Sequence, residues 1–200
     1  MASPDTAELT KSKTLLLAGH KGLAKSSLVA GVATALGATL FNLTPSNTAG
    51  QYAGKPLVTR MLHLVGKIAK ATGAPAIICI DEIDQVFAKK LPKEITTDPK
   101  RIRKELPKFI EGFLPEDKVM IIATSDRPWD AEAALIETFP RCLCVDLPTH
   151  NSRLALWRHL LKQKLDVSAL AEVDINMLAR FSDGYTSSDV PLFFFYCITR

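Results

Sequence analysis

The sequence predicts an α/β fold in which a five-stranded parallel sheet lies between helices and is followed by a helical part. Two observations predict it. Short apolar, β-branched runs alternate with longer segments whose apolar residues recur every three or four positions, and this alternation stops at Pro148. Near-continuous apolar strands are typical of parallel sheets that are covered on both faces. The expected strands are 14–18, 38–43, 76–80, 119–124 and 142–147.

Helices are expected between these strands, over 26–36 and 57–72. In the second helix, the residues that would form one apolar face are Leu57, Met61, Leu64, Val65 and Ile68. Strand–helix alternation of this kind favours a doubly wound sheet, in which ligands bind at the carboxyl ends of the strands.

Beyond Pro148 the sequence predicts helices only, over 151–164, 174–181 and 187–199. We therefore expect a large α/β part over residues 1–148 and a helical part over 149–200. Because the chain ends inside the apolar pattern LFFFYCITR, the helical part is expected to be incomplete.

The composition is that of a globular domain. Of the 200 residues 47% are hydrophobic and 23% are charged, and the net charge of +4 is too small to favour nucleic acid as a partner. No apolar run reaches the roughly 18 residues of a membrane span, and the first residues lack the apolar centre of a secretion signal. The cysteines form no CxxC pair, and buried, reduced thiols are expected at Cys79, Cys142, Cys144 and Cys197.

A phosphate-binding loop is indicated by GHKGLAKS, which follows the first strand and precedes a helix. It fits the pattern G-x4-G-K-[ST] except that Ala24 replaces the last glycine. Backbone N–H groups of such a loop wrap phosphates, Lys25 would neutralise their oxygens and Ser26 would bind Mg²⁺. An ordinary strand–helix turn is the alternative. The residues expected to bind the nucleotide are Gly19, His20, Lys21, Gly22, Leu23, Ala24, Lys25, Ser26 and Ser27.

A pair of acids follows the third apolar strand, in IICIDEID. Asp81 would hold Mg²⁺ through water, and Glu82 would orient or activate an attacking water molecule. Two acids after a strand can also simply cap a loop. Their occurrence in the expected order after Lys25 favours ATP or ADP with Mg²⁺ as the ligand.

Further motifs give the chain a resemblance to the AAA ATPases, in the group that contains katanin and spastin. SNTAGQYAGK, over 46–55, looks like the first pore loop with Tyr52 as its aromatic residue, and 99–112 is similar to the segment that carries the second. IIATSDRPWDAEAAL resembles the sensor-1 strand, and DGYTSSDV resembles the signature of the helical lid. The resemblance implies a nucleotide-binding subdomain followed by a lid, and a site in which Glu82 and Asp126 act on the nucleotide.

Several residues depart from the family pattern. Ala24 adds a methyl group where backbone approaches phosphate, and Asp126 stands where the family has an asparagine. Where active relatives carry paired arginines, this chain has Ile136, Glu137 and Thr138, and Arg141 is offset from those positions. An arginine finger is worth on the order of 10³–10⁵ in rate. The departures imply nucleotide binding with slow or absent hydrolysis.

Within the family, LFNLTPSNTAGQYAGK and RPWDAEA look most like the IQ-motif and AAA-domain proteins. This closer resemblance implies the axoneme of a cilium or flagellum, the doublet microtubule, and neighbours in the nexin–dynein regulatory complex. Between 89 and 108, eight basic residues outnumber three acidic ones. This segment is either a solvated surface or a contact for an acidic partner such as a tubulin tail.

Two functions therefore compete. The first is a nucleotide-binding AAA module that serves as a structural or regulatory part of the axoneme, without nucleic acid or membrane as a partner. The second is an active, oligomeric ATPase that threads or remodels a polypeptide such as a microtubule-associated protein. Tyr52 and Glu82 favour the second, whereas Asp126 and the missing arginines favour the first.

Overall fold

The structure is a computed structural model. It describes residues 13–43, 57–87, 99–113, 117–131, 133–163 and 173–198. The first pore-loop-like segment, with Tyr52, lies outside the described residues. So does the part of the basic segment 89–108 that precedes residue 99. Contacts within the chain divide it into two compact units. One combines Met1–Gly19 with Lys25–Cys144, and the other combines His20–Ala24 with Val145–Arg200.

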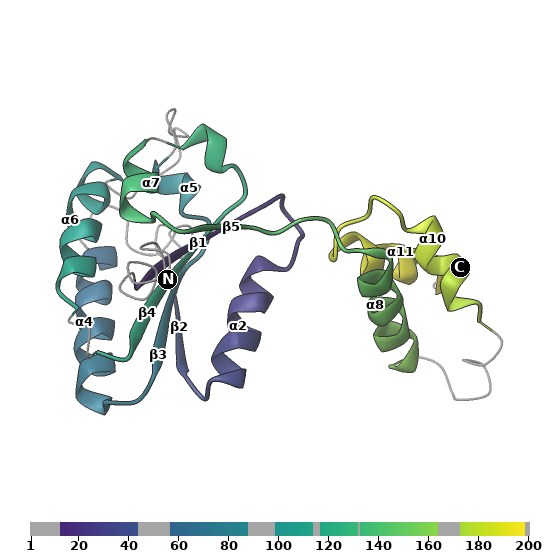
Figure 1. Cartoon of the computed structure of the whole chain (residues 1–200), viewed down its shortest axis with the longest axis horizontal. Coiled ribbons are helices and arrows are strands. Elements are labelled where there is room, and N and C mark those ends of the chain that lie inside the picture. The colour runs from purple at the N-terminus through teal and green to yellow at the C-terminus, as the bar shows by residue number, and fades with distance from the viewer. Residues whose placement is uncertain are drawn as a thin grey trace, which may run out of the picture. The chain divides into compact units, whose positions relative to one another are not determined.

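The first unit is built on a parallel sheet of five strands, which confirms the predicted fold class (Figure 1). The strands are β1 (Thr14–Ala18), β2 (Thr39–Leu43), β3 (Ala76–Ile80), β4 (Val119–Ser125) and β5 (Cys142–Cys144). Their order in space is β2-β3-β4-β1-β5, so β1 and β3 flank the central strand β4. The carboxyl ends of β1, β3 and β4 therefore lie at one edge of the sheet, next to each other.

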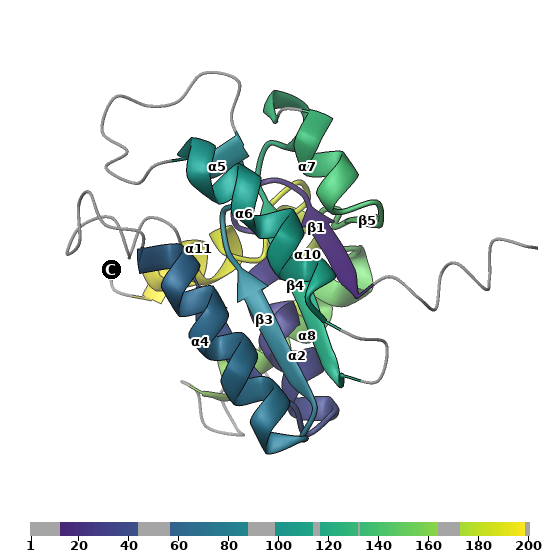
Figure 2. The same ribbon diagram turned by 90° about the vertical axis from the view of Figure 1, so that its left-hand side faces the viewer.

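Helices cover both faces of this sheet. They are α2 (Lys25–Ala35), α4 (Leu57–Thr72), α5 (Asp84–Phe87), α6 (Pro99–Glu111) and α7 (Ala133–Thr138), with a short 3₁₀ turn over Pro128–Asp130. Figure 2 shows α4 and α6 in front of β3 and β4, with α2 behind the sheet.

The alternation of side chains along each strand divides the core between the two faces. On the α2 side, Ile77 and Ile122 pack in one cluster with Val29. On the opposite side, Ile78 and Ile121 pack in a larger cluster that contains aromatic side chains of α6 and the loop after it. Because β3 and β4 are buried on both faces, their continuous apolar sequences are explained.

The structure corrects three details expected from the sequence. The fifth strand ends at Cys144, short of Leu147. Cys79 is buried as expected, but Cys142 and Cys144 are exposed, because β5 is an edge strand that pairs only with β1. In α4 the buried stripe runs through Val65 and Ala69, and the side chains of Leu64 and Ile68 are 59% and 41% exposed.

Among its described residues, the second unit contains three helices, α8 (His150–Lys162), α10 (Ile175–Phe181) and α11 (Asp189–Ile198). Its core is a cluster of buried side chains that centres on Trp157, whose ring meets those of Phe193 and Phe194 edge-on. The Trp157 indole N–H donates to the Ser182 hydroxyl at 3.0 Å, so the buried ring is satisfied at its polar end. None of the described helices is both long enough and apolar enough to cross a membrane.

Candidate nucleotide site

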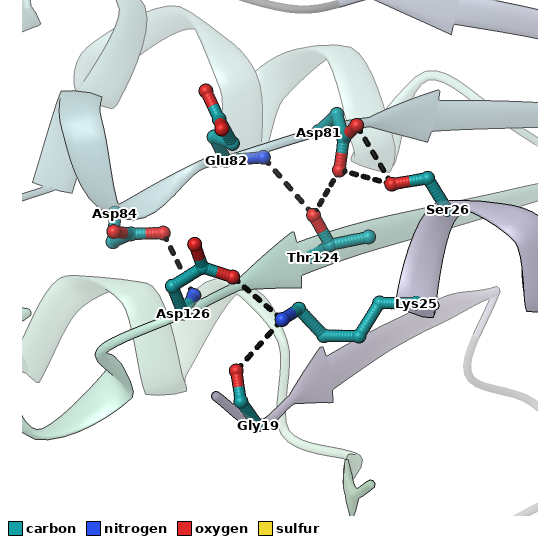
Figure 3. A network of polar contacts seen from close by, with 8 residues as sticks. All are labelled: Gly19, Lys25, Ser26, Asp81, Glu82, Asp84, Thr124 and Asp126. Atoms are coloured by element: carbon teal, nitrogen blue, oxygen red, sulfur yellow. Dashed lines mark hydrogen bonds and ion pairs between the residues drawn. The ribbon is translucent and has the colours of Figure 1, made fainter. Parts of the chain in front are cut away.

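The carboxyl ends of β1, β3 and β4 gather polar side chains of the first unit into one network (Figure 3). Lys25 begins α2 shortly after β1, Asp81 and Glu82 follow β3, and Asp126 follows β4. Parallel pairing brings these ends together although they are far apart in the chain, with Ile80 opposite Ala123 and Ala18 opposite Ser125. The sheet therefore assembles the acids and the lysine that the sequence singled out.

The ammonium group of Lys25 contacts oxygen atoms of Asp126 and Gly19. Its Nζ lies 2.5 Å from Oδ1 of Asp126 and donates to the carbonyl oxygen of Gly19 at 2.7 Å. The Lys25 side chain is only 6% exposed, whereas that of Asp126 is 25% exposed. A cation withdrawn from water needs a compensating anion. In this structure the carboxylate of Asp126 supplies that anion.

Ser26 and Asp81 form a second pair. The Ser26 hydroxyl lies 2.9 Å from Oδ1 and 2.8 Å from Oδ2 of Asp81, so a hydroxyl and a carboxylate from two elements meet at one point. Mg²⁺ prefers hard oxygen donors of this kind and keeps several of its waters. The donor set therefore fits the metal-binding role that the sequence assigned to both residues.

Thr124 joins the two acids that follow β3, and sequence reasoning missed it. Its hydroxyl donates to Asp81 and accepts from the backbone N–H of Glu82 at 3.0 Å. The register places Thr124 next to Asp81, because Ala123 pairs with Ile80. A polar residue at the end of the apolar run VMIIAT was the available signal. Asp84 was also missed, and its Oδ1 accepts from the N–H of Asp126 at 3.2 Å.

Two site residues other than glycine have left-handed backbone. Ala24 has φ of 60° and Glu82 has φ of 53°. This conformation costs a residue with a Cβ roughly 1–2 kcal/mol. At Glu82 the bond from its N–H to Thr124 helps to hold the conformation, and strained backbone of this kind is frequent at functional sites.

The middle of the expected phosphate loop is assigned to the second unit. Within that unit, the carbonyl oxygen of Gly22 accepts from the N–H of Ser188 at 3.0 Å. A Cβ at Gly22 would lie 2.7 Å from Oγ1 of Thr186, so only glycine fits there. Leu23 is buried, His20, Lys21 and Ala24 are exposed, and Ser27 in the first unit is exposed as well.

The remaining expected residues lie apart from this network. Ile136 and Glu137, two of the predicted departures from the family pattern, are exposed on α7. Burial, and secondarily the Asp81 carboxylate, raise the pKa of the Cys79 thiol to about 12, so this thiol is neutral beneath the site.

The comparisons with known proteins agree with this fold. The model of the ATPase family associated with various cellular activities (AAA) matches residues 15–147. The chain therefore belongs to the AAA family.

Curated relatives include a dynein regulatory complex protein, a spastin and a katanin-like protein. The chain is 35% identical over 188 residues to mouse dynein regulatory complex protein 11, covering 89% of this chain and 21% of that protein. It is 31% identical to spastin of Anopheles gambiae, covering 90% of this chain and 22% of that protein. It is 28% identical to a katanin p60 ATPase-like protein of Danio rerio, covering 89% of this chain and 37% of that protein. The chain thus spans about a fifth to somewhat over a third of these relatives.

Among solved structures, the AAA domain of FIGL-1 in complex with ADP superposes with a TM-score of 0.72 at 22% identity. The match covers 90% of this chain and 57% of that one. At this identity it supports the fold alone.

Proposed function

We propose that this chain is an ATP-binding AAA module that serves as a structural or regulatory part of the ciliary axoneme and hydrolyses ATP slowly or not at all. The ion pair between Lys25 and Asp126 carries the proposal. It places a fixed negative charge beside the lysine that would bind phosphate, where an amide would be neutral. The second unit would serve as the helical lid of this module.

The roles of the site residues follow from their chemistry. Bound ATP would supply the phosphoryl group, and Mg²⁺ would add its positive charge to that of Lys25. Lys25 would bind phosphate oxygens after exchanging its partner Asp126, and Ser26 and Asp81 would hold the metal ion. Glu82 would orient water. These residues support nucleotide binding better than they support nucleotide hydrolysis.

The exposed surface of α7 also favours slow turnover. At the positions where an arginine would reach the phosphate of a neighbouring protomer, this helix presents an apolar side chain and Glu137, both exposed. A carboxylate there would repel the transferring phosphate instead of stabilising it.

The axonemal placement draws on the similarity to mouse dynein regulatory complex protein 11. Cells with motile cilia that express a tagged full-length protein should retain it in detergent-extracted axonemes, on or near the doublet microtubules. Complete release with the soluble fraction would remove the axonemal part of the proposal while leaving nucleotide binding untouched.

Titration with a fluorescent ATP analogue in the presence of Mg²⁺ tests the binding itself. We expect Lys25→Met to weaken binding at least tenfold, roughly the loss of one charge-assisted contact to phosphate. A matched control is Lys118→Met, an exposed lysine just before β4 and away from the phosphate loop, which should retain most of the affinity. Equal losses in both variants would argue against a site centred on Lys25.

The second candidate is an active remodelling ATPase. Glu82 favours this function, because an acid with strained backbone follows Asp81, the residue proposed to bind the metal ion. The similarity to spastin and to a katanin-like protein favours it as well. Phosphate release and mass measurement with ATP present separate the two. Turnover in the roughly 1–10³ s⁻¹ range of ordinary enzymes, by a ring-sized assembly, would favour remodelling over scaffolding.

The positive charge of the basic segment 89–108 supports a contact with an acidic partner, of which a tubulin tail is one example. Co-sedimentation with intact and tail-cleaved microtubules compares binding in the presence and absence of these tails. Binding that disappears with the tails would support the contact, and equal binding to both would remove tubulin tails from the proposal.

A further inference from the structure

A small pocket lies between α4 and α6 in the first unit, away from the nucleotide site. Its volume is about 170 Å³, and lysines from both helices surround a floor of aromatic rings. Figure 2 shows the two helices next to each other on the same face of the sheet. α4 ends at Thr72, just before β3 begins at Ala76, whereas Asp81 follows the opposite end of β3. The end of the pocket near Lys70 is therefore near the amino ends of the strands.

The floor of the pocket is made possible by a glycine. A Cβ at Gly66 would lie 3.0 Å from the ring of Phe109 and 3.1 Å from that of Phe113, so both rings press directly on α4. The two rings meet edge-on with centroids 5.0 Å apart, and the ring of His63 meets Phe109 in the same way at 5.8 Å. This arrangement is rigid and largely apolar.

The rim of the pocket is basic. Lys67, Lys70 and Lys108 line it, and none of the other described residues that line it is acidic. Lys70 is engaged by Asp117, which lies 3.1 Å from its Nζ, and by the carbonyl oxygen of Gly112. Lys67 and Lys108 form no ion pair with any residue that the structure describes, and both are exposed. The rim therefore retains two uncompensated positive charges.

Apolar surface continues from the pocket along α4. Leu64 and Ile68 are exposed beside Lys67, and α4 contains no acidic residue. Exposed apolar side chains next to unpaired cations suit a partner that combines both chemistries.

We propose that this pocket is a docking site for an acidic peptide segment of a partner protein, in which carboxylates meet Lys67 and Lys108 and one apolar side chain meets the aromatic floor. Charge complementarity selects the acidic peptide, and the volume accommodates a side chain rather than a folded element. Nucleic acid is disfavoured because the net charge of the chain is only +4. The proposal is independent of nucleotide binding.

Fluorescence anisotropy tests the site with a fluorescein-labelled, glutamate-rich peptide that carries a single leucine. We expect saturable binding to the whole chain that weakens with added salt. Lys67→Glu combined with Lys108→Glu should weaken it about tenfold or more, since two rim ion pairs are replaced by repulsion. Both substitutions are at exposed positions, so folding and affinity for the ATP analogue should be unchanged.

Arg158→Glu combined with Lys162→Glu is the matched control, because it changes the net charge equally at exposed positions of α8, in the second unit and outside the pocket. This variant should bind the peptide within about twofold of the wild type, as expected for distant exposed charges. Replacing the leucine of the peptide by glycine should also weaken binding. Equal losses in the two charge-reversal variants, no effect of the leucine, or tighter binding of an oligothymidine would each overturn the proposal.

Discussion

The Nζ atom of Lys25 lies 2.5 Å from Oδ1 of Asp126, a carboxylate 101 residues further along the chain. Both residues stand just beyond the carboxyl ends of neighbouring strands, β1 and β4. A phosphate that binds Lys25 would have to take the place of this carboxylate or share the lysine with it. If the proposed site is correct, this ion pair opposes nucleotide binding, and the first prediction concerns its removal.

Asp126→Asn should increase affinity for ATP by roughly tenfold, because one close negative charge disappears and Lys25 becomes available to phosphate. Without nucleotide the same variant should be less stable than the wild type, since Lys25 loses its ion pair with the Asp126 carboxylate. Losing a buried partner costs about 3–5 kcal/mol, and the 25% exposure of Asp126 places the expected loss below that range. Calorimetric titration and urea unfolding measure the two effects.

Asp84→Asn is the matched control for that change, because it removes the same charge from a neighbouring position while an amide oxygen can still accept from the N–H of Asp126. We expect little change in affinity. If both variants gained affinity equally, the cause would be the overall charge of the site and the Lys25–Asp126 pair would not be special.

Ala24→Gly should stabilise the phosphate loop. Ala24 has φ of 60°, a conformation that costs a residue with a Cβ roughly 1–2 kcal/mol. Glycine removes this strain, but it destabilises the folded chain by about 0.4–1 kcal/mol because it raises the entropy of the unfolded chain. The expected net gain in unfolding free energy is about 0–1.6 kcal/mol, together with tighter nucleotide binding. Ala30→Gly in the middle of α2 is the contrasting control and should destabilise. A loss of stability in Ala24→Gly would contradict the strain.

Thr124→Val should damage the site without changing its shape. It removes the hydroxyl that donates to Asp81 and leaves the N–H of Glu82 without its acceptor, which costs about 1–3 kcal/mol for a buried group. Mg²⁺-dependent binding should weaken with it, because Asp81 and Glu82 lose their common support. Thr124→Ser keeps the hydroxyl and should recover most of both properties. Equal behaviour of the two variants would mean that the methyl group matters instead.

Asp189 should make the second unit sensitive to acid. Its carboxylate accepts from the backbone N–H and the hydroxyl of Thr186, at 2.9 and 2.8 Å, while the hydroxyl of Thr186 accepts from the N–H of Asp189, which forms a capping box before α11. Hydrogen bonds from the backbone and side chain of Thr186 lower the pKa of Asp189 below its ordinary value of 3.8.

The lowered pKa determines how the stability of the second unit depends on pH. The folded chain keeps Asp189 ionised at pH values at which the unfolded chain has protonated it. The stabilisation by ionised Asp189 is therefore present above the ordinary pKa of an aspartate and is lost as the pH falls through the lowered pKa of the folded chain. Carboxyl NMR titration should show Asp189 below its ordinary value, and Asp189→Asn should reduce the helical signal of α11 at neutral pH. Asp146→Asn, at an exposed position, is the control that should leave both unchanged. An ordinary titration of Asp189 would contradict the capping box.

Much of the fold could be predicted because it is local. Continuous apolar runs determined β3 and β4. The pattern from Gly19 to Ser26 correctly predicted a turn between a strand and a helix, and its role in binding phosphate stays a prediction. The acids after β3 were recognisable for the same reason. All of these depend on the spacing of residues within a short window.

Tertiary structure decided what depends on distant neighbours. Thr124 became part of the site only through the register of β4 against β3, and Lys25 met Asp126 only because β1 lies beside β4. The aromatic rings of α6 and its following loop pack against α4 at Gly66. On this side of α4 Val65 and Ala69 are buried, whereas Leu64 and Ile68 remain exposed. Sequence periodicity specifies that a helix has an apolar side, whereas the partner packed against it decides which residues are buried.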